Sequence, residues 1–234
     1  MDRREREEPV IVALDGPAAS GKSSVGLAVA RRLKFNFVET GKLYRALALK
    51  ALRDGLPLDG APALAKVFAG TRVTYEFRGG EAVVEVDGED VTAELAAAEV
   101  AEAASAISAL PEVREVLLPL QRAHARAPGV VVEGRDVGTV VFPDAAYKFY
   151  LDASVAERAR RRAQDFAAAG RNVDVSDVER DLAARDERDA AREAAPLRRA
   201  DDAVYVDTTN VLFDEVVNFI VNYVSNAEEA RAER

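Results

Sequence analysis

The chain has 234 residues, of which 49% are hydrophobic and 31% charged, a composition unlike that of a disordered chain or a membrane protein. It has no cysteine and one histidine, His124, which excludes disulfides, thiol nucleophiles and cysteine-ligated metals and leaves a single residue for any histidine-based site. The formal net charge of -9 argues against broad nucleic-acid binding, because such proteins usually carry a basic excess.

Both ends of the chain are rich in charged residues. Residues 1–8 lack the apolar run of a signal peptide, and polar side chains interrupt the apolar stretch 211–224. We therefore expect charged tails at 1–8 and 227–234, no membrane span and a cytoplasmic location. The sequence has no extended apolar seam or heptad repeat, so the expected state is a monomer.

Short apolar runs rich in β-branched residues predict strands, and stretches of helical periodicity separate most of them. The predicted strands cover 10–14, 36–38, 130–132, 147–151 and 203–206. The predicted helices cover 22–33, 42–54, 112–127 and 212–224, with two more Ala- and Arg-rich helices on either side of 170–172. Thr40 is a candidate N-cap, and Pro111 suits a first helical turn. This alternation predicts an α/β fold with a doubly wound, five-stranded parallel sheet.

The segment from 56 to 98 interrupts the alternation of strands and helices. Prolines and an Asp-Gly pair punctuate its beginning, and residues 72–77 and 82–86 predict two short strands. Arg78-Gly79-Gly80 lies between them and is typical of a hairpin turn. We therefore expect a small β-containing subdomain inserted into the α/β fold.

The strongest motif is Gly-Pro-Ala-Ala-Ser-Gly-Lys-Ser at 16–23, which fits G-x-x-x-x-G-K-[ST]. It follows a predicted strand and opens a predicted helix, as a phosphate-binding P-loop must. In such a loop the backbone N–H groups converge on phosphate, Lys22 reaches the β- and γ-phosphates, and Ser23 would hold Mg²⁺. The alternative, a Gly-rich turn that binds nothing, is disfavoured by this context.

A P-loop alone does not distinguish switch GTPases, ATPases and small-molecule kinases. The chain has no D-x-x-G and no N-K-x-D, so the guanine switch motifs are missing. Between residues 154 and 199 there are eleven arginines, ten acidic residues and no lysine. Such a composition suits a lid that clamps a transferring phosphate, although a salt-bridged solvated helix would have it too.

Two further patterns place charged side chains near the predicted site. Arg185, Asp189 and Arg192 are spaced to share one helix face, where they could hold phosphate and ribose or form a surface ion-pair ladder. The run 133–138, Glu-Gly-Arg-Asp-Val-Gly, follows a predicted strand at the sheet edge where α/β proteins bind ligands. A tight turn with a local Arg-Asp pair is its alternative interpretation.

Taken together, these motifs resemble bacterial cytidylate kinases, which are P-loop nucleoside monophosphate kinases, over about residues 10–224. The matching motifs are the P-loop at 16–24; Glu-Thr-Gly-Lys-Leu-Tyr-Arg at 39–45; Ala104-Ser105 with Val113-Arg114-Glu115; the run 133–144; Arg-Asp-Glu-Arg-Asp at 185–189 with Arg192; and Ala195-Pro196-Leu197. The hairpin segment is similar to the insert of that family. The family often has Asp-Ser-Gly where this chain has Glu39-Thr40-Gly41, which keeps the hydroxyl.

The resemblance implies ATP- and Mg²⁺-dependent phosphorylation of CMP and dCMP, with Mg²⁺ bound together with ATP. It implies that Ser105, Arg114 and Asp136 read the cytosine edge. The sugar and acceptor phosphate are then contacted by Thr40, Asp189, Arg185, Arg45, Arg135 and Arg192. A uracil would place an acceptor opposite the Asp136 carboxylate, so UMP should be a poor substrate.

On the donor side, the resemblance implies an ATP site formed by the P-loop and by lid arginines. These residues are Gly16, Pro17, Ala18, Ala19, Ser20, Gly21, Lys22, Ser23, Ser24, Arg158, Arg161 and Arg162. Lys22, Arg161, Arg135 and Arg192 are the expected catalytic residues, and Arg161 is the preferred lid arginine. His124 is expected to be a surface or packing residue.

The implied organisation is one kinase domain over 9–226, made of a core, an NMP-binding region and a lid. The core covers about 9–40, 111–157 and 193–226, the NMP-binding region with its insert about 41–110, and the lid about 158–192. Two alternatives stay open at this stage, namely a kinase for UMP or a non-nucleotide alcohol, and a nucleotide-gated switch without turnover.

Overall fold

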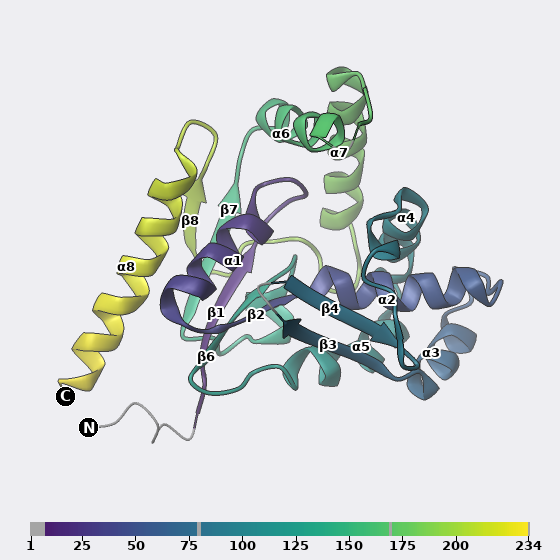
Figure 1. The fold of residues 1–234 in the computed structure, drawn as a ribbon, viewed down its shortest axis with the longest axis horizontal. Helices are drawn as coiled ribbons and strands as arrows, with labels where there is room; N and C mark the ends of the chain where they lie inside the picture. The colour runs from purple at the N-terminus through teal and green to yellow at the C-terminus, as the bar shows by residue number, and fades with distance from the viewer. Residues whose placement is uncertain (1–7, 79–80, 169, 234) are drawn as a thin grey trace.

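The computed structural model describes residues 8–78, 81–168 and 170–233 (Figure 1). Its central sheet has five parallel strands in the order β2-β6-β1-β7-β8. The strands are β1 (Val10–Asp15), β2 (Asn36–Glu39), β6 (Gly129–Glu133), β7 (Tyr147–Asp152) and β8 (Val204–Asp207). The predicted doubly wound, five-stranded sheet is therefore confirmed.

The central strand β1 and its neighbour β6 are buried on both faces of the sheet, which explains their continuous apolar, β-branched sequences. Along β1, Val12 and Leu14 belong to one hydrophobic cluster while Ala13 belongs to the other, and Val130 and Val131 of β6 divide in the same way. Each fully buried Val or Leu contributes about 1.5–3 kcal/mol relative to an exposed one. Burial on both sides thus fixes the strands that end at the site.

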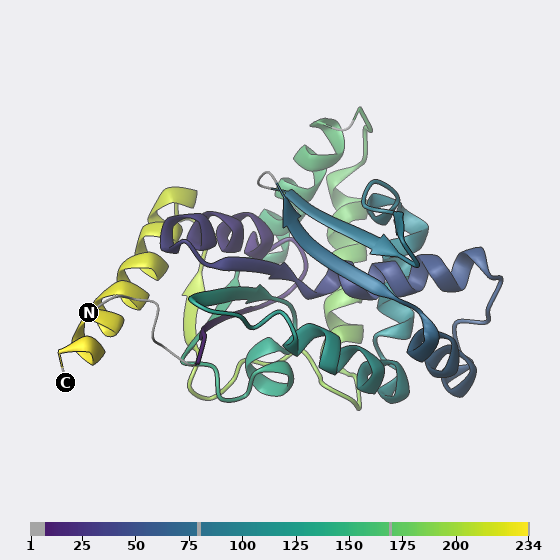
Figure 2. The same ribbon diagram turned by 60° about the horizontal axis from the view of Figure 1, so that its bottom comes forward.

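Helices cover both faces of the sheet (Figure 2). One face carries α1 (Lys22–Leu33) and α8 (Phe213–Ala232), which pack against each other. The other carries α2 (Thr40–Arg53) and α5 (Pro111–Arg122). In the described ranges, none of the helices combines the length and apolar character needed to cross a lipid bilayer.

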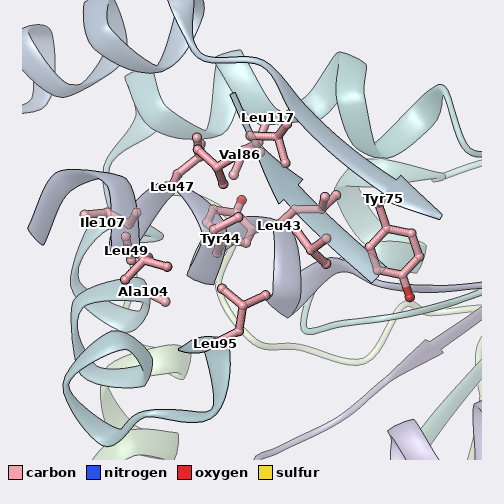
Figure 3. Packing of buried hydrophobic residues seen from close by; sticks show 14 of the residues in the cluster. Leu43, Tyr44, Leu47, Leu49, Tyr75, Val86, Leu95, Ala104, Ile107 and Leu117 are labelled. Carbon is pink, nitrogen blue, oxygen red and sulfur yellow. The ribbon is translucent and has the colours of Figure 1, made fainter. Parts of the chain in front are cut away.

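The insert contains a three-stranded antiparallel sheet, β3-β4-β5, and two helices. Its elements are α3 (Ala61–Gly70), β3 (Val73–Arg78), β4 (Glu81–Val86), β5 (Glu89–Asp90), the short helix η2 (Glu94–Ala96) and α4 (Ala98–Ile107). The predicted pairing of two strands is confirmed, whereas β5, α3 and α4 were not predicted; Gly79 and Gly80 lie outside the described residues. Figure 3 shows that Tyr75 and Leu95 of this region pack with Leu43 and Leu47 of α2, so the insert shares the core of the main domain.

Two helices, α6 (Val155–Ala168) and α7 (Val175–Ala190), pack on each other and project at the top of Figure 1. Their small apolar cluster contains Ala159, Val178 and Leu182, together with Ala18 of the P-loop. The two predicted Ala- and Arg-rich helices are thus confirmed, and the loop after β1 packs directly on them.

Three helix ends differ from the predictions. Thr40 is the first residue of α2 rather than its N-cap, since its hydroxyl donates to the Glu133 carbonyl at 2.9 Å. α5 ends at Arg122 instead of 127. A turn follows it, in which the ring of His124 packs edge-on against Tyr75. α8 continues to Ala232, through most of the expected C-terminal tail, and Glu228 in its last turns accepts a 2.8 Å hydrogen bond from the Tyr147 hydroxyl.

Candidate active site

A cavity of about 740 Å³ opens at the carboxyl ends of β1, β2 and β6. Ligands bind at this edge in open α/β sheets, because loops from neighbouring parallel strands converge there. Nearly every residue expected from the sequence lines this cavity. The lining includes 18–24, Thr40, Arg45, Ser105, Arg114, Arg135, Asp136, Arg161, Arg162, Arg185, Asp189 and Arg192, whereas Gly16, Pro17 and Arg158 are outside it.

The P-loop joins β1 to α1 and is held in a conformation suited to phosphate. Gly16 has φ +147°, and a Cβ there would lie 1.9 Å from the Leu151 carbonyl oxygen, so only glycine fits. Lys22 is buried, and its Nζ donates to the Pro17 carbonyl at 2.5 Å and to the Ser20 hydroxyl at 3.2 Å. Burial, and then the charge of Arg135, hold the pKa of Lys22 below its usual range. The lysine is thus held inside the loop that is predicted to bind phosphate.

Asp15, at the end of β1, ties the P-loop strand to the loop after β6. Its two carboxylate oxygens accept hydrogen bonds of 2.7 Å from the N–H groups of Val137 and Gly138. Burial raises the pKa of Asp15 to about 6, although both hydrogen bonds oppose that rise. The sequence analysis missed this residue; its only signal is an acid at the end of an otherwise apolar strand.

Glu133, at the end of β6, is a second buried acid that the sequence analysis assigned no role. Burial raises the pKa of its carboxyl group, while Lys22 and a hydrogen bond with Ser23 oppose the rise. The side chain thus lies beside the two P-loop residues expected at the phosphates and the metal. An acid that directly follows a buried strand was the available signal, and P-loop enzymes commonly place a metal-binding acid at the end of a neighbouring strand.

One end of the cavity contains a buried ion pair between Arg114 of α5 and Asp136. Arg114 also donates to the Ser108 carbonyl at 3.1 Å, and its guanidinium lies 5.8 Å from the centre of the Tyr44 ring. Burial raises the pKa of Asp136, and Arg114 opposes that rise. Ser105 lines the cavity next to this pair, so the three predicted base-reading residues come together. Ser108 and Tyr44 were not predicted.

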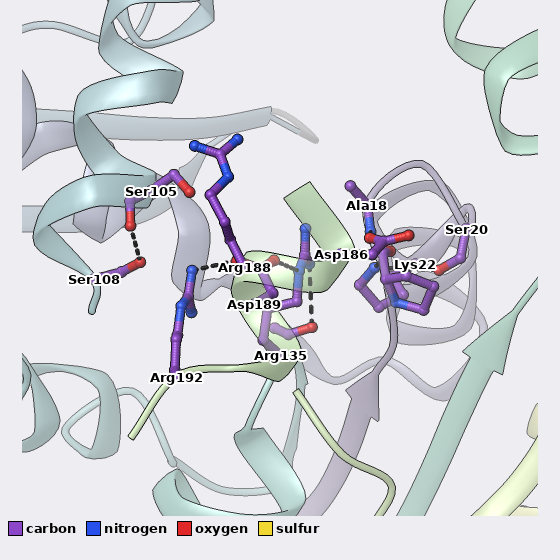
Figure 4. A network of polar contacts seen from close by, with 12 residues as sticks. Ala18, Ser20, Lys22, Ser105, Ser108, Arg135, Asp186, Arg188, Asp189 and Arg192 are labelled. Atoms are coloured by element: carbon purple, nitrogen blue, oxygen red, sulfur yellow. Dashed lines mark hydrogen bonds and ion pairs between the residues drawn. The ribbon is translucent and has the colours of Figure 1, made fainter. Parts of the chain in front are cut away.

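Between the ion pair and the P-loop, several arginines surround the carboxylate of Asp189, which is 1% exposed (Figure 4). Asp189 accepts from Nε of Arg135 at 3.1 Å and pairs with Arg192. Arg192 lies beyond the end of α7, so the predicted sharing of one helix face is replaced by a contact from the following loop.

In the part of the chain that the structure describes, the remaining arginines of this cluster, Arg45 and Arg185, form no ion pair that would balance their charge. Arg45 donates to the Leu95 carbonyl at 3.1 Å, and burial lowers its pKa. Burial and the neighbouring Arg135 lower the pKa of Arg185 to about 10. Within the described ranges, Nε of Arg185 is buried without a hydrogen-bond partner. The cluster formed by Arg45, Arg135, Arg185 and Arg192 therefore carries more positive charge than Asp189 balances, and it fits an anion.

The arginines of α6, which are expected in the lid, have different surroundings. Arg161 donates to the Thr208 carbonyl at 2.6 Å, to the Thr208 hydroxyl at 3.0 Å and to Glu157 at 2.8 Å. Arg162 lies 4.6 Å from the centre of the Phe166 ring and faces the cavity. The expected placement of Arg158 at the donor phosphates differs from the structure, because this side chain is buried against Ala18 and Asp186 outside the cavity.

Comparisons with known proteins indicate one family. The family model described as cytidylate kinase matches residues 12–226. A cytidylate kinase of Geobacter sulfurreducens is 44% identical over 221 residues, which are 94% of this chain and 95% of the relative. One from Pelotomaculum thermopropionicum is 45% identical over 215 residues, or 92% and 95% of the two chains.

Among solved structures, an uncharacterized protein from Eubacterium ventriosum has a similar fold, with a TM-score of 0.53 and 11% identity over 92% of this chain and 98% of the other. That likeness concerns the fold alone. The family match and the identities to curated relatives carry the assignment further: the chain belongs to the cytidylate kinase family, whose members are phosphotransferases that phosphorylate CMP and dCMP.

Proposed function

We propose that this chain transfers the γ-phosphoryl group of ATP to CMP and dCMP in the cavity described above. The observation that carries the proposal is the cluster of four half-buried arginines that lines the cavity with Asp189, between the P-loop and the Arg114–Asp136 pair. A P-loop supplies a donor site, and a base-reading pair supplies an acceptor site. An excess of positive charge between them suits the phosphates that react.

On the acceptor side, Asp136 accepts a hydrogen bond from the exocyclic amine of cytosine, and Arg114 and Ser105 meet its ring nitrogen and carbonyl. Arg45, Arg135 and Arg192 bind the acceptor phosphate. Thr40, Arg185 and Asp189 contact its sugar and phosphate end. The ion pair between Arg114 and Asp136 supports this assignment, since it holds both recognition groups in place before the base arrives.

On the donor side, backbone N–H groups within the P-loop (16–24) and the amino group of Lys22 bind the phosphates of ATP. Arg161 and Arg162 approach these phosphates from the lid, and Arg161 acts in catalysis with Lys22, Arg135 and Arg192. The acceptor phosphate is already an anion, so the transfer requires no general base. Catalysis therefore consists of positioning, charge stabilisation and exclusion of water.

The residues around Ser23 fit a magnesium ion. A serine hydroxyl and the carboxylate of Glu133 are linked by a hydrogen bond beside Lys22, and hard oxygen donors are what Mg²⁺ prefers. Ser23 and Glu133 would hold the ion together with the nucleotide phosphates. When bound, it neutralises charge on the transferring phosphoryl group. The role of Glu133 here extends the set expected from the sequence.

The expected division into core, NMP-binding region and lid is part of the proposal. α6 and α7 form the lid, and α2, the insert and α4 form the NMP-binding region. The monomeric state and the absence of nucleic-acid partners stay predictions.

A coupled assay of ADP release tests the proposed reaction. ATP and Mg²⁺ are supplied with CMP, dCMP, UMP, AMP or GMP, and a Lys22→Ala variant is the control. We expect turnover with CMP and dCMP, little with the others, and turnover at least about a hundredfold lower in the control. Comparable turnover with UMP would contradict the base-reading roles, and no turnover with any acceptor would contradict the reaction itself.

Asp15 should make CMP binding sensitive to acid. Protonation near pH 6 removes one of its two acceptors for Val137 and Gly138, so the loop that carries Asp136 loosens and KM for CMP rises. The folded pKa lies above the unfolded value of 3.8, so the folded state binds the extra proton between these values, and this group favours folding as the pH falls. We therefore expect acid to weaken CMP binding through this loop and not through unfolding of the protein.

The measurement is KM for CMP from pH 5 to 8 in the wild type and in Asp15→Asn. The variant should have a raised KM at every pH, and the ratio of variant to wild type should shrink below pH 6. Taking the ratio removes the titration of the CMP phosphate, which both enzymes share. A ratio that stays constant across this range would show that Asp15 does not act in this way.

A further inference from the structure

The P-loop is joined to α6 and α7 through the backbone N–H and C=O groups of Ala18. Nη1 of Arg158 donates to the Ala18 carbonyl at 3.1 Å and to Oδ2 of Asp186 at 2.5 Å. The other carboxylate oxygen, Oδ1 of Asp186, accepts a long hydrogen bond of 3.4 Å from the Ala18 N–H. One ion pair between α6 and α7 thus contacts both polar groups of residue 18 in the donor loop.

The Arg158–Asp186 ion pair is largely buried, and an apolar cluster accompanies it. The side chain of Arg158 is 4% exposed and that of Asp186 is 19% exposed, and Nε of Arg158 is fixed by a 2.9 Å bond to the Ala153 carbonyl. Ala18 itself belongs to the lid's apolar cluster with Ala159, Val178 and Leu182. The loop and the lid therefore share a small core, which is more than a surface contact.

The backbone next to Ala18 needs such support. Ala19 has φ +59°, a left-handed conformation that an alanine rarely adopts. A conformation of this kind persists where its surroundings determine it. The Arg158–Asp186 ion pair, which we call the clamp, supports the loop in this shape at the preceding residue.

The clamp also connects the donor loop to the acceptor side. Asp186 stands on α7 between Arg185 and Asp189, which belong to the arginine cluster, and Figure 4 shows Asp186 beside Ala18 and Lys22 while Asp189 contacts Arg135 and Arg192. Arg158 stands one turn before Arg161 and Arg162 on α6. The ion pair therefore joins the P-loop to the two helices on which Arg161, Arg185 and Asp189 stand.

We propose that Asp186, acting through Arg158, is a positioning residue that fixes the Ala18 peptide and so holds the donor-phosphate loop in register with the lid. This inference rests on the proposed function, and it deepens the account of the ATP site. It gives Arg158 a role different from direct contact with ATP.

Steady-state kinetics of three variants test the role. In Asp186→Asn, kcat/KM for ATP should fall by about ten- to hundredfold, because displacement of a positioned group by about 1 Å is costly. KM for CMP should stay close to that of the wild type, since Arg135 and Arg192 hold Asp189 from the other side. The matched control is Asp177→Asn, which removes an exposed ion pair with Arg180 on the same helix and should leave both parameters unchanged.

The third variant separates positioning from stability. Arg158→Met combined with Asp186→Leu replaces the buried pair by apolar side chains, which usually restores stability. We expect its unfolding temperature to match that of the wild type while kcat/KM for ATP stays low, because nothing then holds the Ala18 peptide. Recovery of kcat/KM together with stability, or an unchanged kcat/KM in Asp186→Asn, would overturn the proposal.

Hydrogen exchange in the nucleotide-free wild type supplies a result that needs no variant. The Ala18 amide should exchange slowly, as expected for a buried and bonded group; fast exchange of this amide would also overturn the proposal. If the wild type phosphorylates none of the acceptors, the proposed function fails. The exchange result still decides whether the clamp exists.

Discussion

Replacing Lys22 by alanine should lower kcat for CMP phosphorylation by about 10²- to 10³-fold, since it removes one preorganised donor at the transferring phosphoryl group. Lys22 is already placed by its bonds to the Pro17 carbonyl and the Ser20 hydroxyl, so no reorganisation of the loop is needed when phosphate arrives. The loss should appear mainly in kcat, because charge develops on the phosphoryl group in the transition state.

The same substitution should not lower stability. Burial disfavours the charged form of Lys22, and the neighbouring Arg135 disfavours it further. An alanine removes that buried cation, so the unfolding temperature is expected to equal or exceed that of the wild type. Stopped-flow or coupled kinetics and thermal unfolding give the two readouts. Lys66→Ala, which changes an exposed lysine of α3, is the matched control and should change neither.

A Lys22→Ala variant with wild-type kcat would contradict the role of this residue in phosphoryl transfer. A variant with a strongly reduced unfolding temperature would contradict the electrostatic argument while leaving the catalytic role open to measurement at a lower temperature. The two parts of the prediction therefore fail separately.

The main sheet could be predicted because its signals are local. Short segments were enough to recognise its parts. The valine-rich run predicts β6, and the P-loop motif predicts the strand before it and the helix after it. Helices α3 and α4 were missed, since α4 buries Val100, Ala103 and Ile107 against α2, a surface distant in sequence. Small residues with few large apolar ones give a weak periodic signal, and tertiary packing decides the structure.

The candidate site could be predicted as a set of residues but not as a network. Nearly all the side chains that the motifs identified line the cavity, because each motif is compact in sequence, whereas lining residues such as Ser108 and Thr208 belong to no motif. Asp15 was missed because its partners, Val137 and Gly138, lie more than one hundred positions further along the chain. Arg158 looked like a phosphate ligand for the same reason, since its partner Ala18 is 140 residues away. Hydrogen bonds of this kind depend on the tertiary arrangement of loops that are distant in sequence.

Replacing Asp136 by alanine should abolish most of the preference for CMP over UMP. We expect kcat/KM for CMP to fall by about 10²- to 10³-fold, because the cytosine amine loses its acceptor in a buried site. The value for UMP should change much less, since a uracil carbonyl gains nothing from the carboxylate. Asp136→Asn should go further and favour UMP relative to the alanine variant, because an amide can donate to that carbonyl.

The ratio of kcat/KM for CMP to that for UMP is the quantity to measure. Asp136 is the buried partner of Arg114, so its removal leaves that guanidinium without its carboxylate, and some loss of stability is expected. The ratio does not depend on the fraction of folded enzyme, whereas each value alone does. Asp144→Asn, at an exposed aspartate that follows the same loop, should keep the wild-type ratio. An unchanged ratio in Asp136→Ala would mean that another group distinguishes cytosine from uracil.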